Sequence, residues 1–183
     1  MRKVSFAINI SLDGVCDHTL FNPNPEIHEY FTEVMNEVDL IFFGRIMYQL
    51  MFPYWANVAR DKSGTYDENK FAEKITSISR VVVSRSLTTS DENTRIVRAN
   101  PAEELLQLKQ LPGKTISVDS ISMLPELIAA GLIDEFKLMI HPVILGNGRR
   151  LLDTGNLQEK LDLKLIETIN FKSGCVALHY LKK

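Results

Sequence analysis

The stretch that decides the fold is KTISVDSISMLPELIAAGLIDEFKLMIHPVILGNGRRLL, residues 114–152. It begins with a short apolar run, turns at Asp119-Ser120, and continues with the apolar spacing of an amphipathic helix. A second, longer apolar run follows and ends in the glycine turn 146–148. A strand, a helix and a second strand form a crossover unit, and ligands of such sheets bind beyond the carboxyl end of the first strand. We therefore look for a functional site near Asp119, Ser120 and the start of the helix.

The composition of the chain is that of one globular domain. Its 183 residues are 45% hydrophobic and 24% charged, which suffices for one buried core and is too short for two comfortable domains. We therefore predict a single domain over residues 1–183. The net charge is -2 and the charges of both signs are interspersed, whereas a nucleic-acid-binding surface needs a basic stripe. We expect no nucleic-acid partner.

The amino-terminal residues predict a strand rather than a targeting segment. Polar residues interrupt the apolar run 4–12, and no small-residue cleavage site follows it. No segment approaches the roughly 20 apolar residues that span a bilayer, so we expect a cytoplasmic protein without a membrane partner. Cys16 and Cys175 lie far apart in the sequence. This separation suggests two reduced thiols and leaves a disulfide between them open.

Strand-length apolar runs alternate with helical spacing along the rest of the chain. Besides the opening stretch, strands are expected at residues 4–10, 40–43, 80–83, 95–97, 161–171 and 175–181. Helices are expected at residues 27–37, after Gly44-Arg45, at 68–75 and at 101–111. Residues 52–65 contain Pro53 and Gly64 and are expected to form a loop. The alternation predicts an α/β fold with a mixed, mostly parallel sheet, helices on both faces and a C-terminal antiparallel hairpin.

Several strand ends carry residue types that suit a phosphate ligand. Arginine side chains can fork onto phosphate oxygens, serine hydroxyls can donate to them, and helix starts present free N–H groups. In a parallel sheet these ends converge on one edge. Each pattern also has an ordinary explanation as a turn with a solvated cation or a capping carboxylate. The strand ends in question are Asp13-Gly14, Gly44-Arg45, Ser84-Arg85-Ser86 and Asp119-Ser120.

The histidines give no comparable signal. His18 and His28 lie near Cys16 and Asp17, but their spacing fits none of the usual zinc patterns, so no metal site is expected. His141 lies inside an apolar run and is expected to be a hydrogen-bonded residue of the core or its edge.

Five motifs stand out when the chain is taken in order. They are Ser11-Leu12-Asp13-Gly14, Gly44-Arg45-x-Met47-Tyr48, Val82-Val83-Ser84-Arg85-Ser86, Gly131-Leu132-Ile133-Asp134-Glu135 and His141-Pro142-Val143-Ile144-Leu145-Gly146-x-Gly148. This ordered set resembles the RibD C-terminal family, which comprises the reductase half of the bifunctional riboflavin deaminase-reductases and single-domain proteins with the dihydrofolate reductase-like fold. The resemblance covers nearly the whole chain, which would be a stand-alone member.

The resemblance implies a homodimeric NADPH-dependent reductase. Hydride would pass directly from the cofactor to a small heterocyclic substrate that is pterin-like, pyrimidine or flavin-related. The cofactor diphosphate would lie along Gly44, Arg45 and Met47, and the adenosine 2′-phosphate against Ser84, Arg85 and Ser86. The nicotinamide would be flanked by Ala7 and Val15, and the diphosphate and ribose covered by Asp119, Ser120, Ile121, Ser122, Met123 and Leu124.

The same resemblance places Asp13 and residues 18–24 beside the substrate. Asp13 is the candidate catalytic residue, which would orient the substrate or relay a proton to it.

The chain departs from the family pattern at the cofactor segment. Asp119 and Ile121 stand where the family commonly has glycine, and Met47 replaces a hydroxyl residue. A non-glycine residue in a left-handed conformation costs roughly 1–2 kcal/mol, and a carboxylate about 4 Å from a phosphate charge costs about 4 kcal/mol at an effective dielectric near 20. The alternative hypothesis is therefore a catalytically degenerate family member that acts as a ligand-binding or interaction protein.

Overall fold

Apolar runs separated by turns become the strands of one sheet. A computed structural model of the chain describes residues 1–21, 24–88, 91–152, 157 and 159–183. Its elements in chain order are β1 (Val4–Ser11), η1 (His18–Leu20), α1 (Pro25–Asn36), β2 (Val38–Gly44), α2 (Arg45–Asp61), α3 (Tyr66–Ser77), β3 (Ser79–Val83), β4 (Thr94–Val97), α4 (Pro101–Gln110), β5 (Thr115–Asp119), α5 (Leu124–Ala129), β6 (Glu135–His141), β7 (Leu163–Asn170) and β8 (Val176–Lys182).

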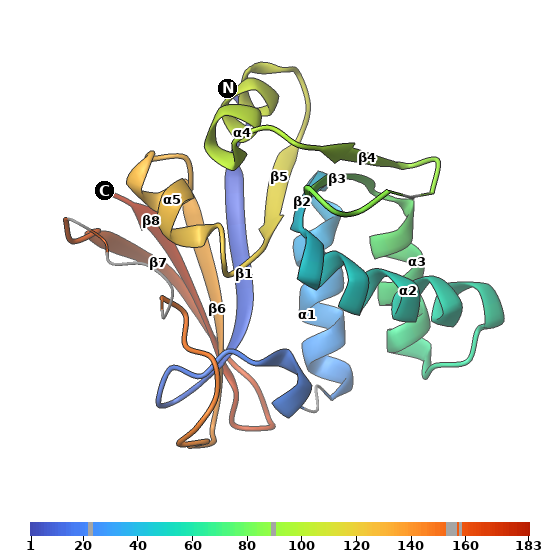
Figure 1. The fold of residues 1–183 in the computed structure, drawn as a ribbon. Coiled ribbons are helices and arrows are strands. Elements are labelled where there is room, and N and C mark those ends of the chain that lie inside the picture. Colours follow the sequence, from blue (N-terminus) through green and yellow to red (C-terminus); the bar gives the residue numbers. More distant parts are fainter. Residues whose placement is uncertain (22–23, 89–90, 153–156, 158) are drawn as a thin grey trace.

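The eight strands follow the order β4-β3-β2-β5-β1-β6-β8-β7 (Figure 1). Neighbours from β4 to β6 are parallel, whereas β8 is antiparallel to both β6 and β7. The mixed, mostly parallel sheet and the C-terminal hairpin are thus confirmed. Gly44 pairs with Val83 and Phe43 with Asp119, so the ends of β2, β3 and β5 share one edge.

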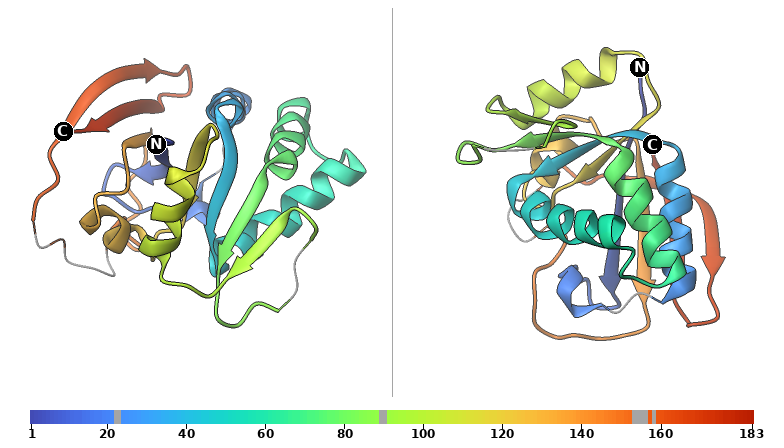
Figure 2. Two further views of the ribbon diagram at one scale, coloured as in Figure 1. Left: turned by 90° about the horizontal axis from the view of Figure 1, so that it is seen from above. Right: turned by 90° about the vertical axis from the view of Figure 1, so that its right-hand side faces the viewer.

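Alternating side chains of the strands bury both faces of the sheet. One face packs on α4 and α5 through residues such as Phe42 and Ile116. The other face packs on α1, α2 and α3 through residues such as Ile41 and Phe43. Helices therefore cover both faces, as predicted, and the two further views in Figure 2 show the two groups of helices on opposite sides of the sheet.

The prediction of a loop over residues 52–65 was wrong, because α2 continues to Asp61 with Pro53 inside it. A proline inside a helix removes one hydrogen bond and crowds the preceding turn. Aromatic packing holds the helix beyond Pro53. The ring of Phe52 stacks on Tyr48 at 5.3 Å, and Trp55 meets Phe71 of α3 edge-to-face at 4.8 Å. The Tyr48–Phe52 contact is local to one face of α2. The contact of Trp55 with Phe71 comes from tertiary structure, and sequence spacing alone does not display it.

Cys16 and Cys175 are buried thiols and are not joined in a disulfide. None of the helices that the structure describes is long and apolar enough to cross a bilayer.

Candidate functional site

The site lies where β1 and β5 meet α1, α2 and α3. A cavity of about 570 Å³ opens there, within the size range of small-molecule sites. Strands contribute Ala7, Asn9 and Asp119 to its wall. The helices contribute mainly aromatic and methionine side chains, namely Phe31, Met35, Met47, Met51, Tyr54, Trp55 and Phe71.

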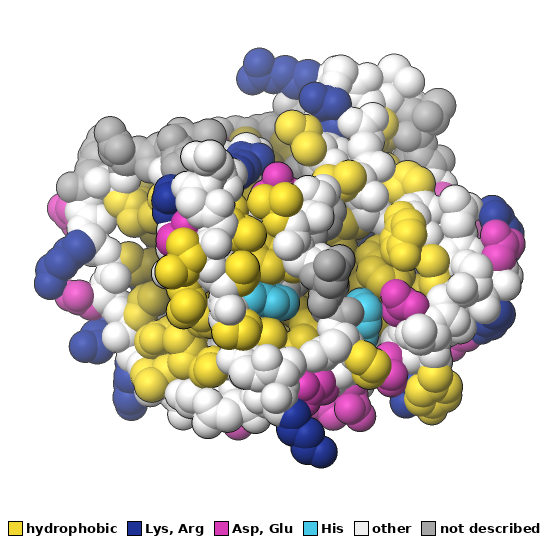
Figure 3. Space-filling view, turned by 90° about the horizontal axis from the view of Figure 1, so that it is seen from below, with side chains coloured by type: hydrophobic (Ala, Val, Ile, Leu, Met, Phe, Trp, Pro, Cys, Tyr) yellow, Lys and Arg dark blue, Asp and Glu magenta, His cyan; other side chains and the backbone are white. Residues whose placement is uncertain are grey.

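Figure 3 shows the side of the molecule on which β1 ends. Hydrophobic side chains gather over much of this face and surround histidine side chains, while lysine and arginine side chains lie mainly at its periphery. Such a surface suits an apolar ring more than a free anion.

Five of the residues predicted to bind the cofactor line the cavity: Ala7, Met47, Asp119, Ser120 and Ile121. The other predicted cofactor residues lie outside its lining. Ser122 is exposed, whereas Met123 and Leu124 are buried in the core at the start of α5. Of the predicted substrate-facing residues 18–24, Thr19 and Phe21 also line the cavity, whereas Asn22 and Pro23 and the His18 side chain lie outside the described part of the structure.

Asp119 is a half-buried carboxylate on the cavity wall. Ser117 Oγ donates to its Oδ1 at 2.9 Å, and no other hydrogen bond reaches this carboxylate from the residues that the structure describes. Burial removes the charge from water and raises the pKa of Asp119 to about 6, although the Ser117 hydrogen bond opposes the shift. Near neutral pH this group can therefore both hold and release a proton.

A set of polar and cationic residues, which we call the cationic rim, lies beside the cavity at the ends of β2 and β3. It consists of Gly44, Arg45, Ser84, Arg85 and Ser86. Gly44 precedes α2 and supplies no side-chain cap to its first-turn N–H groups. Arg45 is exposed and donates to Gln49 Oε1 at 2.8 Å.

The serine turn of the cationic rim is held by its own hydrogen bonds. The backbone N–H groups of Ser86 and Leu87 donate to Ser84 Oγ at 3.2 and 2.9 Å. Arg98 Nη1 donates to the Ser84 carbonyl at 2.8 Å. Arg85 and Ser86 are exposed, so this turn presents a cation and a hydroxyl to solvent.

Gly44 is required by a close approach between β2 and the end of β5. A Cβ on Gly44 would lie 2.5 Å from Ser120 Oγ and 3.0 Å from Ser120 Cβ. Ser120 Oγ also accepts a long hydrogen bond from the Met123 N–H at 3.4 Å. The cationic rim and the cavity are therefore joined at Gly44 and Ser120.

Asp13 is tied to a neighbouring loop. Ser11 Oγ donates to its Oδ1 at 2.7 Å, and the N–H groups of Leu145 and Gly146 donate to Oδ1 and Oδ2 at 3.0 and 2.8 Å. These bonds, that from Ser11 first, lower the pKa of Asp13 to about 2. Asp13 does not line the cavity among the described residues, and its catalytic role stays a prediction.

Val15 packs in the same loop contact. It is fully buried, forms an isolated bridge with Arg150, and lies where a Cβ on Gly148 would reach within 2.5 Å of Val15 Cγ1. The glycine motif at Gly146 and Gly148 thus seats the 143–150 loop against the loop that follows β1.

Sequence reasoning missed Asn9. It shares a sheet face with Ala7, two residues away, and this period-two relation could have identified it. The Asn9 amide oxygen accepts from His141 Nε2 at 2.7 Å. His141 Nδ1 lies 3.6 Å from Cys175 Sγ, and the ring lies 4.5 Å from that of Phe21. His141 is therefore the hydrogen-bonded residue that was expected, and burial lowers its pKa.

His28 and Glu68 were likewise not anticipated at the site. Both line the cavity from the helices. Burial lowers the pKa of His28, which favours the neutral imidazole. Among the described residues, no group of three His, Cys, Asp or Glu side chains is arranged to bind a metal ion.

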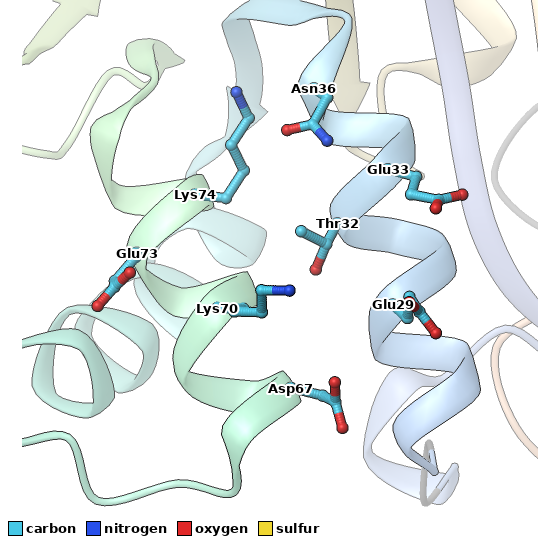
Figure 4. A pocket seen from close by; sticks show the side chains of 8 residues that line it. All are labelled: Glu29, Thr32, Glu33, Asn36, Asp67, Lys70, Glu73 and Lys74. Carbon is cyan, nitrogen blue, oxygen red and sulfur yellow. The ribbon is translucent and has the colours of Figure 1, made fainter.

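A second hollow of about 480 Å³ lies on the outer side of α1 and α3. In Figure 4, Lys70 and Thr32 point into the space between the two helices, whereas Glu73 and Glu33 point away from it. The groove mixes acidic and basic side chains and lies away from the strand ends. It has the character of a solvated helix surface, where such charge pairs contribute little.

Comparisons with known proteins show the family to which the chain belongs. The chain matches the model of the RibD C-terminal domain over residues 2–177. It is 29% identical over 187 residues to YyaP, an uncharacterized protein of Bacillus subtilis (strain 168), with 98% of this chain and 94% of YyaP covered.

The fold is shared with solved structures, among them two reductases. RibD of Acinetobacter baumannii (form 1) superposes with a TM-score of 0.71 at 16% identity, covering 100% of this chain and 58% of that one. Dihydrofolate reductase from Enterococcus faecalis, complexed with NADP(H) and RAB-propyl, superposes with a TM-score of 0.64 at 12% identity, covering 99% and 96%. The dihydrofolate reductase-like fold is therefore confirmed, and with the match over residues 2–177 the chain belongs to the RibD C-terminal domain family.

Proposed function

We propose that the protein is an NADPH-dependent reductase that passes a hydride directly to a small heterocyclic substrate, which is pterin-like, pyrimidine or flavin-related. The supporting observation is the junction at Gly44 and Ser120, where the cationic rim meets an apolar cavity that contains a carboxyl group. A phosphate-bearing cofactor with a flat reactive ring needs both surfaces side by side. The Enterococcus faecalis enzyme of this fold is complexed with NADP(H), which agrees with the proposal.

The residues present suit such a cofactor. The uncapped first turn of α2 offers N–H groups to a diphosphate, with Arg45 beside them. Arg85 and Ser86 are exposed where they could hold a 2′-phosphate. NADPH would supply the hydride, and Ala7 on the cavity wall would lie against its ring.

The replacement of family glycines at residues 119 and 121 does not strain the backbone. Among the described non-glycine residues, only Lys62 has a positive φ. The conformational penalty expected for Asp119 is therefore absent. Its raised pKa also weakens the electrostatic objection, because a carboxyl group with a pKa of about 6 is partly protonated near neutral pH.

For the proton that accompanies the hydride, we propose Asp119. It lines the cavity and its pKa lies near the operating pH, as general acid catalysis requires. Asp13 is a weaker candidate because hydrogen bonds from Leu145 and Gly146 fix its carboxylate to the 143–150 loop, and a third comes from Ser11. An Asp119→Asn variant that kept the full rate and pH profile of NADPH consumption would contradict this assignment.

The second candidate function is a family member that binds a heterocycle without reducing it. Ile121 is a buried side chain where the family commonly has glycine, and Ser120 Oγ fills the space against Gly44. These side chains would hinder the approach of a diphosphate to the backbone at residues 120 and 121.

NADPH titration separates the two candidates. Trp55 lines the cavity, so its fluorescence should report binding, with calorimetry as the second measurement. We expect saturable NADPH binding, and Arg85→Ala should weaken NADPH about tenfold or more while leaving NADH nearly unchanged, because only NADPH carries the 2′-phosphate. Arg60→Ala, at the far end of α2 and paired with Asp61, is the matched control and should change neither.

One outcome would contradict the reductase, and another would contradict only the role of Arg85. Absence of NADPH binding up to millimolar concentration would contradict the reductase, and recovery of binding in Asp119→Gly would then support the degenerate member. Equal weakening of NADPH and NADH by Arg85→Ala would overturn only the 2′-phosphate assignment.

We also propose that the protein is a cytoplasmic homodimer. The exposed apolar residues of the edge strand β7, Leu165 and Ile166, support the dimer. Cell fractionation that recovered the protein with the membranes would contradict the location.

A further inference from the structure

The cavity lining contains two carboxylates, Glu68 and Asp119, and no lysine or arginine among the described residues. A phosphate group is normally held by arginine, lysine or several N–H donors. Arg45 and Arg85 are exposed and lie outside this lining. The cavity is therefore poorly suited to a phosphorylated ring.

Glu68 is committed to the structure of α3. Its Oε2 accepts from the Thr65 N–H at 2.7 Å, and the Glu68 N–H donates back to Thr65 Oγ1 at 3.3 Å. This capping box fixes the side chain at the helix start. The backbone bond to Thr65 is also the main cause of the lowered pKa of Glu68.

Asp119 is available to a ligand. Ser117 Oγ donates to one of its oxygens, and the described residues give the other oxygen no donor. A half-buried carboxylate that faces a roomy, largely apolar wall has lost part of its hydration without gaining a cation, which costs free energy. A ligand with a positively charged nitrogen would restore the missing partner.

The walls around Asp119 favour the same kind of ligand. Phe31, Trp55 and Phe71 line the cavity, with Trp55 and Phe71 held edge-to-face. Aromatic faces attract flat rings and cations. The neutral state favoured for His28 adds no positive charge that would repel such a ligand.

We propose that the cavity binds an unphosphorylated aromatic ring that carries a basic nitrogen, and that Asp119 is the residue that selects it. Calling this ring the substrate rests on the proposed reductase function. The binding preference itself does not require NADPH, so the two proposals can fail separately.

The test is a binding comparison on the full chain without cofactor. Benzamidine, its neutral isostere benzamide, and phenyl phosphate are titrated by calorimetry and by Trp55 fluorescence. We expect benzamidine to bind at least tenfold more tightly than benzamide, and phenyl phosphate to bind most weakly. Benzamidine affinity should rise several-fold from pH 5 to pH 7, because the probe stays cationic while Asp119 ionises.

Two variants test whether the preference for benzamidine over benzamide comes from Asp119 or from Glu68. Asp119→Asn, which is nearly isosteric, should remove the difference between benzamidine and benzamide. Glu68→Gln should retain the difference, because glutamine preserves the capping box. Circular dichroism confirms that both variants are folded, and Asp119→Ser serves as a second variant at this position.

Three results would overturn the proposal. These are equal binding of benzamidine and benzamide, tighter binding of phenyl phosphate, and a preference that survives in both Asp119 variants. Failure of all three probes to bind at millimolar concentration would overturn it as well. A protein that prefers benzamidine yet binds no NADPH would support this inference and contradict the reductase.

Discussion

Asp119 lines the proposed binding cavity, and its charge there lowers the stability of the folded protein. Its carboxyl group faces the cavity with one hydrogen bond from Ser117, so the folded state stabilises its charge less well than water does. Residues at binding sites often reduce the stability of the free protein, and a substitution that removes the cost then raises stability while impairing function.

We predict that Asp119→Asn stabilises the protein above pH 6. Burial raises the pKa of Asp119 from 3.8 to about 6, so between these values the folded state binds more protons than the unfolded state. Wild-type stability therefore falls as the pH rises from 4 to 6. Asparagine does not ionise, so the variant lacks this loss. Its free energy of unfolding should exceed that of the wild type by about 2 kcal/mol at pH 7 and should equal it near pH 4. Urea unfolding across this pH range measures the difference.

Asp91→Asn is the control with the opposite sign. Although burial raises the pKa of Asp91, hydrogen bonds from Thr94 and Arg80 lower it to about 2. Its stabilisation is present above pH 4 and lost as the pH falls toward 2. After allowance for solvent screening, Asp91→Asn should lower the free energy of unfolding by about 1 kcal/mol at pH 7. If both substitutions raised the free energy of unfolding at pH 7, or both lowered it, the explanation from burial would be contradicted.

At the scale of elements, the site depends on the close approach of β2 and α2 to the end of β5. Gly44 ends β2 and precedes α2, and Ser120 follows β5 directly. Because Gly44 has no side chain, these segments come close enough to join the cationic rim to the cavity.

We predict that Gly44→Ala destabilises the protein by about 1–3 kcal/mol through overpacking. The added Cβ would lie 2.5 Å from Ser120 Oγ, so one segment must move. Ser120→Gly in the same chain removes the obstructing atoms and should recover part of the loss, which chemical unfolding of the single and double variants can show. Strictly additive effects would mean that the two residues do not oppose each other.

At the scale of the whole molecule, strands from both ends of the chain share one sheet, with β1 at its centre and β7 at its edge. The single domain over residues 1–183 stays a prediction. An edge strand offers unpaired backbone groups to another chain, and β7 adds exposed Leu165 and Ile166, which are 49% and 46% exposed.

We predict a homodimer that uses the β7 edge. Light scattering at micromolar concentration should give twice the chain mass of 20.8 kDa, and Leu165→Lys with Ile166→Lys should shift the protein toward monomer. Leu106→Lys on α4 replaces a leucine that is 43% exposed and should leave the dimer intact. A wild-type monomer under these conditions would exclude the dimer.

The sequence by itself determined the order of strands and helices and the family. Apolar periodicity and turn residues are local properties, so the strands, the final hairpin and most helices could be predicted from them. The motif from His141 to Gly148 points to the family because its glycines and Asp13 seat one loop against another. The prediction from local pattern was wrong after Pro53, where α2 continues and Trp55 packs against the distant Phe71.

Only the tertiary structure decided what surrounds each candidate residue. Asp119 was predicted to cover the cofactor diphosphate and ribose, and that role stays a prediction. Only the fold shows that it lines a largely apolar cavity together with Asn9 and the aromatic side chains of three helices. The pKa of a carboxyl group depends on such through-space neighbours, and these come from parts of the chain far apart in sequence. The residue that seemed to weaken the enzyme interpretation has thereby become the centre of the proposed site.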